Sequence, residues 1–79
     1  MYRAAKNVNG VIMEIGDDQG QSGSTASGNT WCSWVFDSIP AWTMPSGLST
    51  DTPMMFKENA AGDGIEVRSD AEVLASPNS

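Results

Sequence analysis

The sequence predicts a mainly β fold: one small, loop-rich domain over residues 1–79, with an N-terminal hairpin, a central aromatic strand, a C-terminal hairpin and room for one or two short helices. Three observations predict it. An Asn-Gly pair separates two apolar runs, aromatic and β-branched residues fill positions 31–36, and residues 65–68 alternate between apolar and charged. A length of 79 residues allows a single domain.

Residues 1–15 are predicted to form the first hairpin. Asn9 and Gly10 tolerate the positive φ of a two-residue type I′ turn, which would pair Val8 with Val11. The same register places Lys6 opposite Met13 and Ala4 opposite Ile15. The face then predicted to be apolar carries Tyr2, Ala4, Val8, Val11, Met13 and Ile15, with Ile12 on the opposite, half-solvated face.

Residues 16–30 have the composition of a flexible Gly/Ser segment, either an arm or a loop. A structureless loop of this length is uncommon within a compact domain. The composition therefore favours an arm laid along another subunit. Asp17 and Asp18 are candidate cation ligands, but the alternating ligand spacing of a calcium loop is missing, so no metal site is predicted.

The stretch from Trp31 to Phe36 is predicted to be a strand with apolar residues on both faces, as in a central strand covered on two sides. Its tryptophans are either core residues or anchors at a protein interface. An extended connection over residues 37–49 follows, in which Pro40 and Pro45 disfavour helix. Trp42, between these prolines, is predicted to pack on the preceding strand or on a neighbour.

The C-terminal elements are open to two interpretations. In the segment Asp51–Gly62, Thr52 and Pro53 can begin a helix, whereas the following Met-Met-Phe run can continue as a strand that turns at residues 61–64. Residues 65–68 alternate and are predicted to be a strand. The segment Ser69–Ala75 begins with a capping box and can form a short helix, or a turn that leads into a strand.

Composition argues against several function classes. The chain has no His and one Cys, which excludes an internal disulfide and a zinc site made of Cys and His alone. A nucleophile elbow and a phosphate-binding Gly loop are both missing. We therefore predict no catalytic residue, no cofactor and no enzymatic activity. A net charge of −6 and the lack of a long apolar run argue against nucleic acid and membrane as partners.

The hypothesis that follows is one of assembly. Val, Ile, Leu and Phe make up 13 of 79 residues, so partner subunits are expected to complete the order of the fold. We expect a non-enzymatic accessory subunit of a large particle, such as a cement, decoration or adaptor protein of a phage-like virion. It would be made in the host cytoplasm, a compartment that a lone Cys fits, and a homo-oligomer such as a trimer is compatible. Its predicted interface residues are Trp31, Trp34, Phe36, Trp42, Met54, Met55 and Phe56.

Two alternatives belong to other classes. A carbohydrate- or peptide-binding module would use Trp31 and Trp42 as a stacking platform. An acidic regulatory protein that mimics nucleic acid would need its carboxylates to line one surface.

Overall fold

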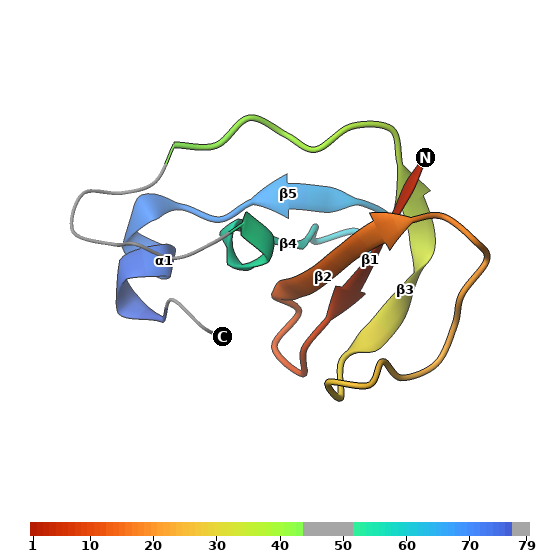
Figure 1. Ribbon diagram of the computed structural model, residues 1–79. Helices are drawn as coiled ribbons and strands as arrows, with labels where there is room; N and C mark the ends of the chain where they lie inside the picture. The colour runs from red at the N-terminus through yellow and green to blue at the C-terminus, as the bar shows by residue number, and fades with distance from the viewer. Residues whose placement is uncertain (44–51, 77–79) are drawn as a thin grey trace.

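The computed structural model describes residues 1–43 and 52–76, and it confirms a mainly β chain (Figure 1). Strands β2 (Ile12–Asp17), β1 (Tyr2–Lys6) and β3 (Thr30–Phe36) form an antiparallel sheet in that order. Strands β4 (Phe56–Glu58) and β5 (Ile65–Val67) form a second, two-stranded sheet. A 3-10 turn, η1 (Thr52–Met55), precedes β4, and helix α1 (Asp70–Ala75) follows β5. The predicted influence of Pro45 lies outside the described residues.

The first hairpin forms where expected, but its loop is longer than predicted. The Asn7 N–H donates to the Val11 carbonyl, and the Gly10 N–H donates to the Asn7 carbonyl. This pattern is a three-residue loop with Gly10, at φ +81°, in the left-handed position. The side chain of Asn7 explains the choice, because its Oδ1 accepts from the N–H groups of Asn9 and Val11. The predicted pairing of Val8 with Val11 is therefore wrong, and Val8 is 99% exposed.

A one-residue bulge in β2 also changes which side chains face the core. Ala4 pairs with Ile15 as predicted, but Lys6 pairs with Ile12 rather than with Met13. Because one extra residue reverses the alternation of a strand, Ile12 turns inward and is fully buried. The prediction that Ile12 lies on the solvated face is wrong for this reason.

The Gly/Ser segment is a loop that contacts its own chain. Figure 1 shows it running around the outside of the first sheet from β2 to β3. Its anchor is the carboxylate of Glu14 on β2, which accepts from the Thr25 hydroxyl at 2.5 Å and from the Asn29 side chain at 2.8 Å. The loop then pairs with the first two residues of β3. The Trp31 N–H donates to the Gly23 carbonyl, and Ser24 forms a β-bridge with Thr30. These contacts within the chain fit the loop interpretation. An arm laid along another subunit stays a prediction.

The C-terminal half resolves both ambiguous segments. The strand interpretation holds for residues 56–58, and the helix frame reduces to the single turn η1. Ser69 caps α1 as the capping box predicts, accepting from the Glu72 N–H at 3.2 Å. The carboxylate of Glu72, however, turns to the side chains of Lys57 and Arg68. The predicted reciprocal cap is thereby replaced by contacts to the second sheet.

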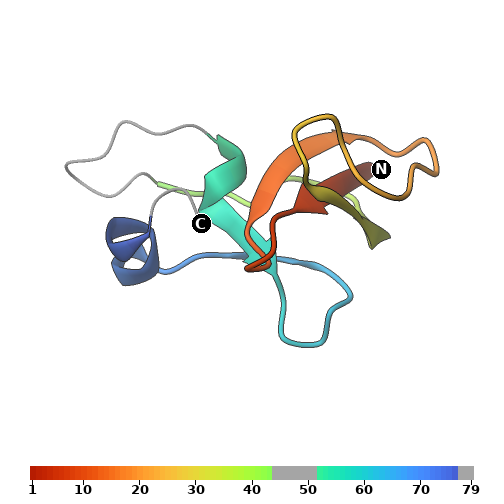
Figure 2. The same ribbon diagram turned by 90° about the horizontal axis from the view of Figure 1, so that it is seen from below.

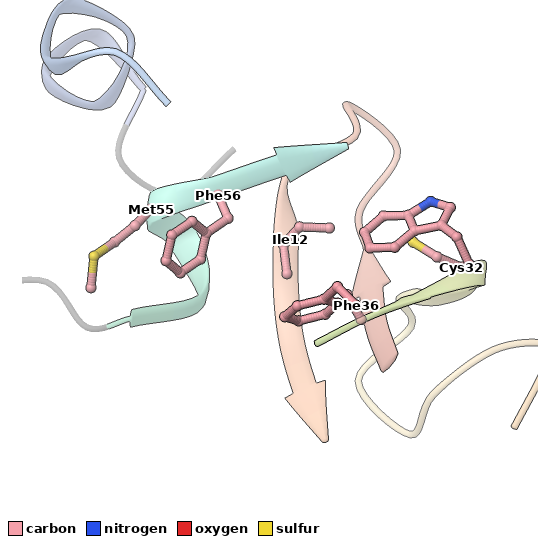
Figure 3. Packing of buried hydrophobic residues seen from close by; sticks show 7 residues of the cluster. Ile12, Cys32, Phe36, Met55 and Phe56 are labelled. Carbon is pink, nitrogen blue, oxygen red and sulfur yellow. The ribbon is translucent and has the colours of Figure 1, made fainter. Parts of the chain in front are cut away.

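The buried core lies where the two sheets meet. Phe56 of β4 points toward Ile12 of β2, and Phe36 of β3 closes the same space (Figure 3). Figure 2 shows β4 beside the turn that joins β1 and β2. A backbone hydrogen bond fixes this crossing, because the Glu58 N–H donates to the Gly10 carbonyl at 2.9 Å. The chain thus makes one shared core from two small sheets.

Candidate functional site

The feature that stands out is strand β3, because it is the longest strand and lies at an edge of its sheet. The sequence predicted a central strand at this position, and that prediction is wrong: β1 is central. Edge strands expose backbone N–H and C=O groups along one side, which makes them templates for pairing with another chain. Natural edges usually carry Lys or Pro as protection, and β3 has neither in Thr-Trp-Cys-Ser-Trp-Val-Phe.

The two faces of β3 differ sharply. Cys32, Trp34 and Phe36 are buried against the core. Trp31 and Val35 are half-buried on the other face, and Ser33 between them is exposed. This alternation follows from the two-residue period of a strand, which the irregular pairing of β3 with β1 leaves intact. The outward face therefore offers an aromatic ring, a branched apolar side chain and a small residue in a row.

Arg3 holds β3 at its irregularity. The register of β1 with β3 shifts between Arg3 and Ala5, so that β3 carries two extra residues there. The guanidinium of Arg3 donates to the Cys32 carbonyl at 2.9 Å and forms an ion pair with Asp18 at 3.0 Å. A carbonyl that the ladder leaves free is thereby satisfied. The backbone N–H of Gly20 and the Arg3 side chain lower the pKa of Asp18, so its carboxylate stays charged.

The first part of the edge is already occupied, and this leaves a defined stretch open. The loop residues Gly23 and Ser24 pair with the start of β3 at Thr30 and Trp31. For Ser33–Phe36, the described residues provide no backbone partner other than β1. We call Ser33–Phe36 the open edge. It is followed directly by Asp37, an exposed carboxylate without an ion pair among the described residues.

A second cluster fixes β3 to the other sheet through Glu58 of β4. One carboxylate oxygen accepts from the Lys6 ammonium at 2.6 Å, and the other accepts from the indole N–H of Trp34 at 2.7 Å. The hydrogen bond from Lys6 lowers the pKa of Glu58, with a further contribution from Trp34. The same hydrogen bond raises the pKa of Lys6. Glu58 thus joins β1, β3 and β4 at one point.

Cys32 lies among the buried core residues (Figure 3), within electrostatic reach of Glu58 and Lys6. Burial raises the pKa of its thiol, with the Glu58 carboxylate contributing in the same direction. A thiol with a raised pKa is a poor nucleophile at neutral pH. The position therefore suits packing rather than covalent chemistry.

The predicted interface residues divide into two groups. Trp34, Phe36, Met55 and Phe56 are buried by the chain itself, within its core. Trp31, Trp42 and Met54 keep partial exposure. Trp42 packs against the core, and its indole N–H is buried without a partner in the described part of the chain. A contact with other subunits stays a prediction for all seven residues. Among them, only Trp31, Trp42 and Met54 are partly exposed to solvent rather than buried.

Sequence reasoning missed the charged residues that organise these contacts. Besides contacts closer in sequence, each of these charged residues forms a hydrogen bond with a group that lies 14 or more residues away. They are Arg3, Glu14, Glu58 and Arg68. Their sequence neighbours give no sign of these partners. Arg68 is the extreme case, because its side chain has 0% exposure and donates to the Met54 and Ser76 carbonyls at 2.8 and 2.7 Å.

The described residues offer neither a metal centre nor a membrane-spanning helix. Within residues 1–43 and 52–76, no group of three or more His, Cys, Asp or Glu side chains is placed to hold a metal ion. No described helix has the length and apolar character needed to cross a bilayer. Comparison with protein-family models, with curated proteins and with solved structures finds no match to this chain. The function must therefore be argued from its own geometry.

Proposed function

We propose that this chain is a non-enzymatic accessory subunit, which joins a larger protein assembly by adding the open edge Ser33–Phe36 to a strand of a neighbouring subunit. The observation that supports the proposal is the position of β3 at the sheet edge without a protecting Lys or Pro. Strand addition of this kind takes its affinity from main-chain hydrogen bonds and its specificity from alternate side chains. Trp31, Ser33 and Val35 are the alternate side chains on offer.

The short length of the open edge suits a repetitive assembly. Each main-chain hydrogen bond contributes only about 0.5–1.5 kcal/mol net, so four residues give modest affinity on their own. Burial of the Trp31 ring adds to this, since aromatic side chains dominate interface energetics. Attachment at many equivalent positions, or at two contacts per copy, would convert such weak contacts into firm binding. Cement, decoration and adaptor proteins of particles work under these conditions.

The setting of a phage-like virion, with the chain made in the host cytoplasm, is the specific form of this proposal. It rests on the small size, the acidic charge of −6 and the β-rich character of the chain. A trimer of the chain, and the completion of its order by partner subunits, belong to the same proposal.

The test is sedimentation of the tagged full-length chain in lysates of the cells from which it comes. We expect the chain to sediment with a particle far larger than its own 8.4 kDa. Ser33→Lys places a charge on the open edge and should move the chain to the top of the gradient. Ser22→Lys makes the same change in the exposed loop and should leave it with the particle. Sedimentation of the unmodified chain as a free small protein would overturn the proposal.

The two alternative functions have less support. Trp42 packs partly against the core instead of offering an open ring for a sugar. Several carboxylates are engaged within the chain: Glu14, Asp18, Glu58 and Glu72 all hold hydrogen-bond or ion-pair partners. Both alternatives stay predictions without an observation in their favour.

A further inference from the structure

The tip of the first hairpin is exposed to solvent. Val8 is 99% exposed, and Asn9 beside it is also exposed. Gly10 follows at φ +81°, and a Cβ placed there would meet no atom within 4 Å. The side chains of Val8 and Asn9 therefore project into solvent, and the position that a Cβ of Gly10 would take is open.

Asn9 and Gly10 together make a reactive pair. The backbone nitrogen of Gly10 can bond to Cγ of Asn9, whereupon the Cγ–Nδ2 bond breaks and Nδ2 leaves as ammonia with the proton of the Gly10 nitrogen. Water then adds to one of the two ring carbonyls of the resulting succinimide and breaks one C–N bond. The product is aspartate or isoaspartate, and neither an oxidant nor a second reactant besides water is needed. The thermolability of asparagine in proteins has this origin.

The sequence makes this position selective. Glycine has no Cβ to obstruct the approach of its nitrogen, and its backbone is unusually free. Each other asparagine of the described ranges precedes a residue that has a Cβ atom: Asn7, Asn29 and Asn59. Asp63 precedes Gly64, but its carboxylate and its N–H are both bonded to the Asn59 side chain.

The attack needs a small local opening. The Gly10 N–H donates to the Asn7 carbonyl at 3.1 Å, and the Asn9 N–H donates to Asn7 Oδ1 at 2.8 Å. Both bonds lie within one exposed turn, and such turns open at low free-energy cost compared with core strands. The Gly10 nitrogen is thus released without unfolding the sheet.

A change at Asn9 would affect β4, because this turn is in contact with it. The Gly10 carbonyl accepts from the Glu58 N–H, and Val11 forms a β-bridge with Lys57, so this turn is the docking point of β4 on the first sheet (Figure 2). In isoaspartate the main chain runs through Cβ and Cγ, which inserts one extra backbone carbon directly before Gly10. The carbonyl of Gly10 must then move relative to β4. A new carboxylate is also added to a chain of net charge −6.

We propose that Asn9-Gly10 is a site of spontaneous modification, at which succinimide formation and isoaspartate loosen the contact between the first hairpin and β4. The proposal is independent of the interface assigned to β3. It makes the junction between the two sheets sensitive to the age of the chain.

The test is incubation of the purified full-length chain in warm, mildly alkaline buffer, followed by peptide mapping and labelling with an isoaspartate-specific methyltransferase. We expect the peptide that contains Asn9 to gain mass by the exchange of an amino group for a hydroxyl and to accept the methyl label. Asn9→Gln should remove both signals. Absence of label from this peptide in the unmodified chain would overturn the assignment of the site.

Hydrogen exchange then tests the structural consequence. The Glu58 amide should exchange at least several-fold faster in the aged chain than in the fresh chain. Asn9→Asp carries the new charge without the extra backbone carbon, and its Glu58 amide should remain protected. If labelled chain keeps full protection at Glu58, or if Asn9→Asp loses it equally, the proposed loosening by the inserted carbon is wrong.

Discussion

The carboxylate of Glu58 allows the junction of the two sheets to be tested by two substitutions at one position. Glu58→Gln keeps an oxygen acceptor for the Trp34 indole but loses the charge that faces Lys6. The side chains of Lys6 and Glu58 are 32% and 20% exposed, so solvent screens their attraction. We expect this loss to cost about 0.5–1 kcal/mol of unfolding free energy.

Glu58→Ala removes the acceptor as well. Trp34 is 8% exposed, so its indole N–H would be left largely buried without a partner. An unsatisfied buried donor costs roughly 1–3 kcal/mol, which brings the total for Glu58→Ala to about 1.5–4 kcal/mol. A domain of 79 residues has a total stability of roughly 4–12 kcal/mol at 0.05–0.15 kcal/mol per residue. The substitution should therefore remove a large share of it.

The assay is urea unfolding followed by tryptophan fluorescence, with the free energies compared at a common slope. Glu66 provides the matched control, because its carboxylate lies on the adjacent strand β5, is 45% exposed and reaches Lys57 only at 3.6 Å. Glu66→Gln and Glu66→Ala should each change stability by less than about 0.5 kcal/mol. Equal destabilisation by Glu58→Gln and Glu58→Ala would refute the reasoning, because the indole hydrogen bond would then contribute nothing.

Three further predictions concern polar contacts of the fold, most of them around α1. Arg68→Met should cost about 1.5–3 kcal/mol, because the part-buried Met54 and Ser76 carbonyls lose a charged donor, while Glu72 keeps its contact with Lys57. Hydrogen exchange should show α1 losing protection first, and unchanged α1 protection would contradict this. Ser69→Ala should cost about 0.5–2 kcal/mol through loss of the N-cap, measured by urea unfolding, whereas Ser69→Asp should keep most of the stability. Acid should also destabilise the fold: Lys6 lowers the pKa of Glu58, and Lys57 lowers that of Glu72, so the unfolded chain binds protons first as the pH falls below about 5. Urea midpoints should thus decrease between pH about 5 and pH about 3, and a Glu58→Gln, Glu72→Gln variant should show a flatter dependence.

Structure could be predicted from the sequence where it depends on residues only a few positions apart. The strand predicted over residues 65–68 forms over Ile65–Val67. The turn at residues 61–64 and the Ser69 cap match one of the two interpretations that the sequence left open, and both depend on neighbours in the chain. The site was less accessible to such reasoning. The sequence marked Trp31 and Trp34 together, but an edge position for β3 and the opposite exposure of these two rings depend on which strand pairs with which.

The sequence by itself determined the β-rich class, the presence of a hairpin at Asn9-Gly10, the aromatic strand and the acidic charge, because propensity, turn chemistry and composition act over short distances. Only the tertiary structure decided the register of the hairpin, the folding of the Gly/Ser loop onto Glu14 and the order β2-β1-β3. These features depend on a single-residue bulge and on polar contacts between distant segments. No local pattern encodes them, because their free energy exists only when the whole chain is folded.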